Sequence, residues 1–148
     1  MKLFFDIEYM IKNNETKNAK DCVNRIIDIY LQYCHKKYDL VCTSDDVIIL
    51  ESSDEKKVSY HLIFKKVVFA NIKHCKSFIQ SVLEQLSNSD ISMLTAFDSN
   101  LKSKLIIDLA VYNKGGFKNT CKGCGNPYIS YLDLITLSPL LNETKNST

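Results

Sequence analysis

Hydrophobic and polar residues follow one another with a changing period along the chain, and each change predicts a new element. Residues 2–9 (KLFFDIEY) are mostly apolar and rich in β-prone side chains, which predicts a buried strand. Between Ala19 and Tyr33 the apolar residues recur three and four positions apart, which predicts a helix. The polar stretch Lys12–Lys17 predicts the loop that joins these two elements.

The middle of the chain has the pattern of further strands. Residues 43–45 predict a turn, and Asp46–Glu51 (DVIILE) predicts a short strand directly after it. Residues Val58–Lys65 alternate between apolar and polar side chains, which predicts a second strand in this region. Residues Val67–Ala70 continue it after a break.

The rest of the chain predicts one helix and one strongly hydrophobic strand. Asn71 is a suitable N-cap for a helix that ends near Leu86. Residues Ser103–Val111 (SKLIIDLAV) predict the most hydrophobic strand, and Gly115-Gly116 predicts a turn after it. Residues Tyr128–Leu141 are apolar without a clear period.

These elements define a fold class. Strands and helices are interspersed without a regular βαβ rhythm, and no GxGxxG motif occurs. We therefore expect an α+β domain with one mixed β-sheet and flanking helices. A chain of 148 residues and 17.0 kDa suits one domain, placed at residues 1–141 and followed by a polar tail at 142–148.

Composition narrows the range of functions only slightly. A hydrophobic fraction of 45% and a charged fraction of 24% are typical of a globular domain. No apolar run approaches the roughly 20 residues that cross a bilayer, so no membrane partner is expected. Asp6 and Glu8 interrupt the apolar start, which disfavours a signal peptide and predicts an intracellular protein. The net charge of +2 excludes no class of ligand and leaves the oligomeric state open.

The cysteines are unevenly spaced, which is typical of reduced intracellular thiols. The Cys121-Lys-Gly-Cys124 motif is at best half of a zinc site, for which Cys34-His35 upstream is a conceivable partner. A turn that holds two thiols is the preferred interpretation, so no zinc is expected.

Three acidic residues are candidate ligands for a divalent metal ion. Asp6 and Glu8 are two positions apart on a predicted strand, so their side chains share one face. Asp108 is the one acid within a strongly apolar strand. Buried carboxylates are costly unless a cation satisfies them, and oxygen ligands suit Mg²⁺ or Mn²⁺. The alternatives are a solvent-facing edge strand for Asp6 and Glu8, and a structural turn cap for Asp108.

A second strand offers a row of donors. Lys57, Ser59 and His61 alternate along one face, and an ammonium, a hydroxyl and an imidazole together suit phosphate oxygens. The alternative is a half-buried strand whose polar side is in water.

Taken in order, the motifs FFDIE at 4–8, SYH at 59–61 and IID at 106–108 resemble the archaeo-eukaryotic primase superfamily. Their flanks, DVIILESSDEKKVSYHLIF and LIIDLAVYNKGGFK, are most similar to the eukaryotic primase-polymerases (PrimPol). The resemblance extends from about Lys2 to Gly125. It implies a catalytic module with an RRM-like core.

The resemblance also implies roles for single residues. Asp6, Glu8 and Asp108 would hold two catalytic ions, Mn²⁺ or Mg²⁺, while Ser59, His61 and Lys57 would contact the triphosphate of a nucleotide. The reaction would be attack of a 3′-hydroxyl on the α-phosphate, directed by a DNA template, in replication and damage tolerance. Lys118 and Lys122, in the basic turn that follows, would be two further phosphate-binding residues.

Parts of the family pattern are not found in these residues. The resemblance leads us to expect a module before the D-x-E strand and a zinc-binding domain after the catalytic module, and neither is recognisable here. Lys118 stands where the family prefers arginine, which is the better phosphate clamp. Two other interpretations therefore remain open: a catalytically inactive nucleotide- or DNA-binding remnant, and an α+β domain unrelated to nucleic acid. The resemblance implies a nuclear or mitochondrial location.

Overall fold

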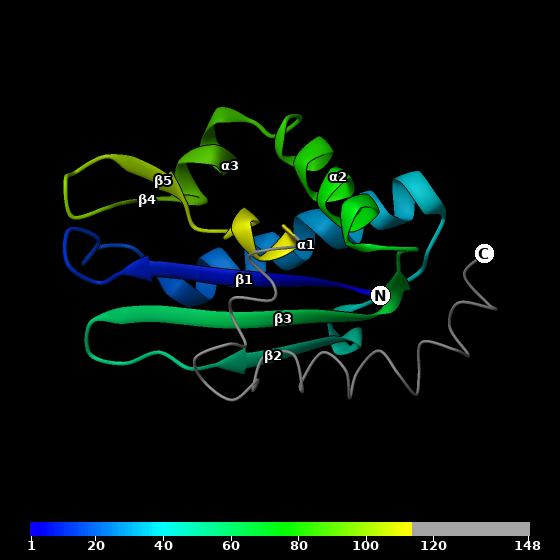
Figure 1. The fold of residues 1–148 in the computed structure, drawn as a ribbon, viewed down its shortest axis with the longest axis horizontal. Helices are drawn as coiled ribbons and strands as arrows, with labels where there is room; N and C mark the ends of the chain where they lie inside the picture. Colours follow the sequence, from blue (N-terminus) through cyan, green and yellow to red (C-terminus); the bar gives the residue numbers. More distant parts are fainter. Residues whose placement is uncertain (114–148) are drawn as a thin grey trace.

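A three-stranded antiparallel sheet with strand order β1-β3-β2 forms the centre of the structure. The computed structural model describes residues 1–113 of the chain (Figure 1). Strand β1 spans Lys2–Met10, β2 spans Val47–Glu51, and β3 spans Lys57–Val68. A second, two-stranded sheet pairs β4 (Thr95–Phe97) with β5 (Ser103–Leu105). The larger sheet is the element that carries the candidate site.

Three α-helices connect the strands, and a polar side chain caps each helix at its N-terminus. Asn18 caps α1 (Ala19–Tyr38), Asn71 caps α2 (Ile72–Leu83), and Ser87 caps α3 (Asn88–Met93). Each cap accepts a hydrogen bond from a backbone N–H of the first turn. Two 3₁₀ turns complete the described elements: η1 at Ser44–Asp46 and η2 at Leu109–Tyr112.

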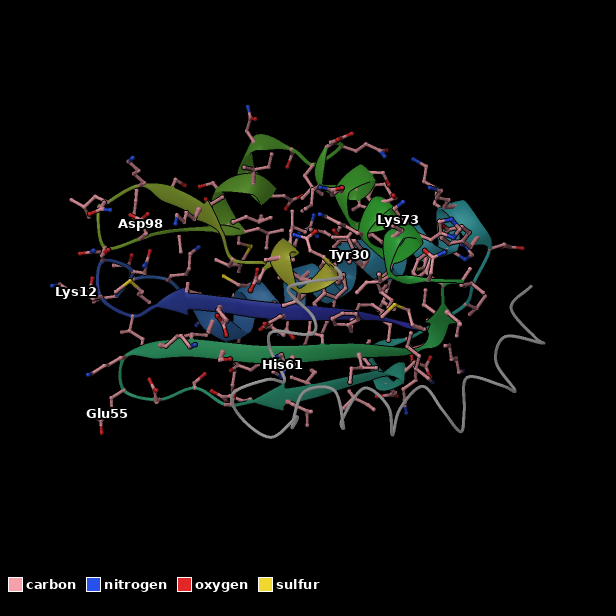
Figure 2. The ribbon with its side chains drawn as sticks, viewed as in Figure 1. Lys12, Tyr30, Glu55, His61, Lys73 and Asp98 are labelled. Carbon is pink, nitrogen blue, oxygen red and sulfur yellow. The ribbon has the colours of Figure 1, made fainter. Side chains whose placement is uncertain are left out.

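The core lies between the sheet and the helices α1 and α2. Helix α1 crosses behind the strands, and α2 lies beyond β1 (Figure 1). Tyr30 of α1 joins the layers, because its ring lies 4.6 Å from the ring of Phe5 and 5.8 Å from that of Phe78. Its hydroxyl donates a 2.9 Å hydrogen bond to the carbonyl of Ile79, and its burial raises the pKa of the phenol strongly (Figure 2). The face of β1 that carries Phe5 therefore packs into the core.

A fourth strand-like segment follows the free edge of β1. Ile107 forms an antiparallel bridge with Ile7, flanked by hydrogen bonds from Glu8 N to Ile106 O (2.9 Å) and from Asp108 N to Asp6 O (2.8 Å). With α3, the β4–β5 hairpin and the 3₁₀ turns left aside, the elements follow a βαββαβ order, and the strands lie side by side as 106–108, β1, β3, β2. The α+β class expected from the sequence is confirmed, and every strand pair within residues 1–113 is antiparallel.

Most predicted elements are confirmed, with shifted ends. The first helix continues five residues beyond Tyr33, to Tyr38, where Asp39 adopts a left-handed conformation and bonds back to the last turn. The two predicted strands at 58–65 and 67–70 are one continuous strand, β3. The second helix ends at Leu83 rather than near Leu86.

The prediction of one long strand at Ser103–Val111 is wrong. The chain forms the short strand β5, moves across to β1 at Ile107, and then turns into η2. Asp108 causes the turn, because its carboxylate accepts a 2.9 Å hydrogen bond from Ala110 N. Helix α3 and strand β4 were not predicted. The predictions for Gly115-Gly116, for Tyr128–Leu141 and for the tail at 142–148 lie outside the described residues.

Within residues 1–113, no helix combines the length and the hydrophobicity that crossing a bilayer requires.

A bidentate ion pair fixes α3 to α1 and predicts a pH dependence of stability. Arg25 Nε and Nη2 lie 2.8 and 3.0 Å from the two carboxylate oxygens of Asp90, and this hydrogen bonding lowers the pKa of Asp90 below its ordinary 3.8. A carboxyl whose pKa is lower in the folded state stabilises above its unfolded pKa, and the effect disappears as pH falls through the folded pKa. We expect Asp90→Asn to cost about 0.5–1 kcal/mol at neutral pH and nothing in strong acid. Urea denaturation at both pH values measures this difference, and an equal cost in acid would contradict it.

Candidate active site

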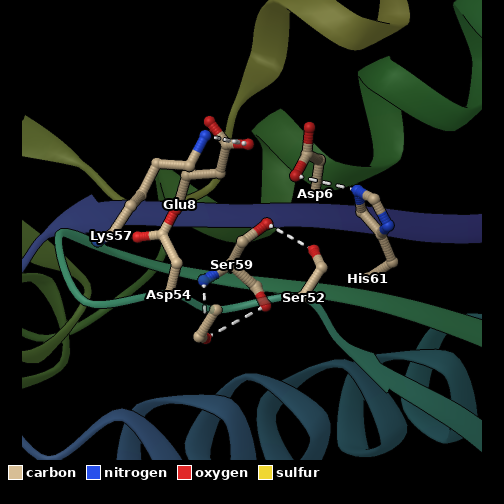
Figure 3. A network of polar contacts seen from close by, with 8 residues as sticks. Asp6, Glu8, Ser52, Asp54, Lys57, Ser59 and His61 are labelled. Carbon is tan, nitrogen blue, oxygen red and sulfur yellow. Dashed lines mark hydrogen bonds and ion pairs between the residues drawn. The ribbon is translucent and has the colours of Figure 1, made fainter. Parts of the chain in front are cut away.

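Polar side chains gather on the face of the sheet opposite α1. Because side chains alternate along a strand, Asp6 and Glu8 lie on the face of β1 that does not carry Phe5. In the register of β1 with β3, Asp6 lies opposite His61 and Glu8 lies opposite Ser59. Directly opposite residues have Cβ atoms about 5 Å apart, so the two sequence motifs form one cluster. Figure 3 shows the carboxylates of Asp6 and Glu8 on the same side of β1.

Asp6 is a buried carboxylate with an incomplete set of partners. The residue is 6% exposed, and its Oδ1 receives no well-oriented hydrogen bond from the described residues. His61 Nε2 lies 3.2 Å from this oxygen, close enough for an ion pair when the imidazole is protonated, although the geometry is poor for a hydrogen bond. A buried carboxylate oxygen whose neighbouring donor is poorly oriented is costly, which makes Asp6 a candidate for a ligand-binding role.

Glu8 and Lys57 form the outer part of the cluster. Lys57 Nζ lies 3.3 Å from Glu8 Oε1, and both side chains are more than a third exposed. Such a pair contributes little to stability and exchanges partners readily. Both groups are therefore free to bind a ligand at a small cost.

Ser59 is held by the turn between β2 and β3. Its hydroxyl lies 3.2 Å from the hydroxyl of Ser52, and its backbone N–H donates to Ser53 Oγ at 3.0 Å. Asp54 closes the same turn by accepting hydrogen bonds from Lys56 N and Lys57 N, which lowers the pKa of its carboxyl. Ser59 is only 4% exposed, so its hydroxyl serves the turn as the structure stands.

Asp108 joins the cluster from the opposite edge of β1. The bridge between Ile7 and Ile107 places Asp108 opposite Asp6, and the backbone hydrogen bond from Asp108 N to Asp6 O fixes this register. Tyr112 anchors the segment further, because its hydroxyl donates to Phe4 O and its ring lies 4.9 Å from that of Phe4. The backbone thus brings all three predicted carboxylates to adjoining positions on neighbouring strands.

The donor set fits a hard divalent cation, although the side chains have other partners. Asp6, Glu8 and Asp108 offer only carboxylate oxygens, which Mg²⁺ and Mn²⁺ prefer, and Asp6 Oδ1 has no well-oriented hydrogen bond that a metal ion would have to replace. Within residues 1–113, however, no three acidic, histidine or cysteine side chains are arranged to hold a metal ion. The carboxylate of Asp108 instead caps η2, where it accepts a 2.9 Å hydrogen bond from Ala110 N. The turn-capping role that the sequence left open for Asp108 is therefore present.

Two predicted phosphate ligands, Lys118 and Lys122, lie outside the described residues, as do Cys121 and Cys124. The turn at Ser52–Asp54, which holds Ser59, was not predicted from the sequence. Its signal was present in the polar run ESSDEKK, which is typical of a tight turn between two strands.

The fold and the cluster are those of a small α+β domain with acidic residues on one sheet face and basic residues beside them. Comparisons with known proteins find relatives that are named DNA-directed primase/polymerase protein. The chain is 36% identical over 85 residues to the DNA-directed primase/polymerase protein of Gallus gallus, and 32% identical over 85 residues to that of Homo sapiens. The protein of the same name from Mus musculus is 33% identical over 85 residues. No family model matches the chain.

The similarity is partial on both sides. The matched region covers about 56% of this chain and about 15% of the relatives' length. Over this region the chain is related to DNA-directed primase/polymerase proteins, as the sequence motifs indicated.

Proposed function

We propose that this chain carries the catalytic centre of a DNA-directed primase/polymerase, which transfers nucleotides from (d)NTPs to a 3′-hydroxyl opposite a DNA template. The observation that carries the proposal is the cluster itself. Three carboxylates on neighbouring strands adjoin Lys57, Ser59 and His61 on one sheet face. A stretch of 85 residues of the same chain is similar to DNA-directed primase/polymerase proteins. The resemblance extends the proposal to replication and damage tolerance in the nucleus or mitochondrion.

In this proposal Asp6, Glu8 and Asp108 hold Mn²⁺ or Mg²⁺. Such ions lower the pKa of an attacking hydroxyl and neutralise charge that develops on the phosphate. Asp6 supplies the buried, unsatisfied oxygen. Asp108 takes part by rotating its carboxylate away from Ala110 N, with which it forms a 2.9 Å hydrogen bond in this structure.

The basic side chains bind the triphosphate. Lys57 neutralises phosphate oxygens as a point charge once Glu8, its partner at 3.3 Å, turns to another cation. His61 lies beside Asp6 and donates a hydrogen bond to the phosphate oxygens. A contact from Ser59 requires its hydroxyl to leave Ser52.

Two observations favour a second candidate, a nucleotide- or DNA-binding remnant without catalysis. The carboxylate of Asp108 is occupied as a cap, and no metal-binding arrangement of three side chains is formed in the described part of the chain. This candidate predicts salt-dependent binding of single-stranded DNA that does not change when the carboxylates are removed.

Substitutions of Asp108 separate its capping role from a catalytic role. Asparagine caps a turn as well as aspartate does but carries no charge. Alanine carries no charge and cannot cap the turn. We expect Asp108→Asn to keep the melting temperature and to lose about 10²-fold or more of primer extension with Mn²⁺. Asp108→Ala is expected to lose the same activity and also about 1 kcal/mol of stability. Full extension by Asp108→Asn would limit Asp108 to the cap and favour the non-catalytic alternative.

A further inference from the structure

A surface cavity of about 220 Å³ lies between the end of β1 and the β4–β5 hairpin, directly beside the candidate active site. Glu8 and Lys57 line it on the side of the cluster, and Asp98 and Lys104 line it on the side of the hairpin. The apolar part of the cavity has two walls that are distant in sequence. One wall is Tyr9 and Met10 of β1, and the other is Ala96, Phe97 and Leu105 of the β4–β5 hairpin.

A buried asparagine fixes the two apolar walls relative to each other. Asn14 is 7% exposed, and its side-chain nitrogen donates to Met10 O at 2.8 Å and to Phe97 O at 2.9 Å. Its side-chain oxygen accepts a 2.8 Å hydrogen bond from Phe97 N. The neighbouring Asn13 donates to Asp98 O, at the end of the molecule where Figure 2 labels Lys12 and Asp98. A side chain with three hydrogen bonds to the two walls preorganises the cavity before any ligand arrives.

The chemistry of the walls suits a flat aromatic ring with polar edges. Phe97 is 49% exposed and Met10 is 37% exposed, which leaves an aromatic face and a thioether available for contact. Two ion pairs border this apolar surface, Lys57 with Glu8 at 3.3 Å and Lys104 with Asp98 at 3.5 Å. Pockets that enclose a whole small molecule measure about 300–1,000 Å³, so this cavity has room for one ring system rather than a complete ligand.

We propose that the cavity binds a nucleobase, which stacks on Phe97 while its sugar-phosphate extends toward Lys57 and the carboxylates. The inference rests on the proposed function and adds to it a recognition residue for the base. Because Glu8 and Lys57 line both the cavity and the cluster, one nucleotide or the end of one strand reaches both. Aromatic stacking tolerates any base, as a template-directed enzyme requires.

The chain contains no tryptophan, so Phe97→Trp introduces a single fluorescent reporter into the cavity. The matched control is Leu101→Trp, because Leu101 is exposed in the same hairpin but does not line the cavity. Each variant of the 148-residue chain is titrated with dATP and Mn²⁺, and separately with a single-stranded oligo(dA). A stacked base quenches the indole emission in a saturable way. Phe97→Ala carries no tryptophan, so its binding of the same probe is measured by isothermal titration calorimetry against the unchanged chain, and we expect it to be about tenfold weaker.

The outcomes assign or overturn the site. Saturable quenching of Phe97→Trp by dATP, with no effect on Leu101→Trp, assigns the base to the incoming nucleotide. The same result with oligo(dA) alone assigns it to the nucleic-acid strand. No quenching, or equal quenching in both variants, overturns the proposal. Primer extension is measured in parallel on the unchanged chain, so extension without selective quenching rejects only the cavity, and selective quenching without extension rejects only the catalytic function.

Discussion

Asp6→Asn is expected to lose about 10³-fold of Mn²⁺-dependent primer extension while the protein remains as stable as before or becomes more stable. Asparagine has almost the same shape as aspartate but no charge, so the substitution removes the Asp6 carboxylate as a ligand of the proposed metal ion. A loss of about 4 kcal/mol of transition-state stabilisation corresponds to this factor. Stability is retained because the substitution removes a buried negative charge from a side chain whose Oδ1 receives no well-oriented hydrogen bond within residues 1–113.

Asp28→Asn is the matched control, because Asp28 is an exposed acid on α1, on the other side of the sheet. It should leave both extension and melting temperature unchanged. A structural role for Asp6 predicts the reverse pattern, in which Asp6→Asn lowers the melting temperature and leaves any extension activity intact. Extension assays and thermal melts on the same preparations distinguish the two roles.

Phe5→Ala is expected to cost about 3–5 kcal/mol of unfolding free energy. Phe5 is fully buried, and its ring lies 4.6 Å from the ring of Tyr30 and 5.6 Å from that of Phe64. Removing the Phe5 ring opens a cavity at the point where β1, β3 and α1 meet. The loss is large because the total free energy of unfolding of a native domain is only about 5–15 kcal/mol. Urea denaturation followed by circular dichroism measures the loss.

Phe97→Ala removes a side chain of the same size and is the control for this prediction. Phe97 is half exposed, so its truncation should cost well under 1 kcal/mol. Equal costs for Phe5→Ala and Phe97→Ala would show that Phe5 does not belong to the core described here.

Local sequence patterns were sufficient for the elements that fold by local rules. The run KLFFDIEY predicted β1 to within one residue of its observed end at Met10, because apolar β-prone residues without Gly or Pro have few alternatives. Asn71 was correctly identified as an N-cap, since its side chain satisfies a helix N–H whatever the helix packs against.

The region after residue 86 could not be predicted in the same way. The run SKLIIDLAV is as apolar as a continuous strand, yet its first part pairs with β4 and its next part pairs with β1. Periodicity records burial but not the partner strand, and the change of partner leaves Asp108 at a turn. The two short elements that precede it, α3 and β4, have six and three residues, which is too short for a clear period.

The candidate site was predictable only in part for the same reason. The spacing of Asp6 and Glu8 fixed their common face, as did that of Ser59 and His61. The pairing of Asp6 with His61 depends on the register between two strands that are separated by α1 and β2, and local sequence does not encode that register. Asn14, which fixes the cavity walls, lies in a polar loop whose sequence gives no sign of its long-range hydrogen bonds.

The central claim is that Asp6, Glu8 and Asp108 together form a divalent metal site, and Mn²⁺ binding tests it without any requirement for activity. The 148-residue chain is titrated with Mn²⁺, and the free ion is followed by its electron paramagnetic resonance signal. We expect saturable binding that Asp6→Asn and Asp108→Asn each weaken by at least about tenfold, and that Asp28→Asn leaves unchanged. The absence of saturable binding, or equal binding by all four proteins, would contradict the claim.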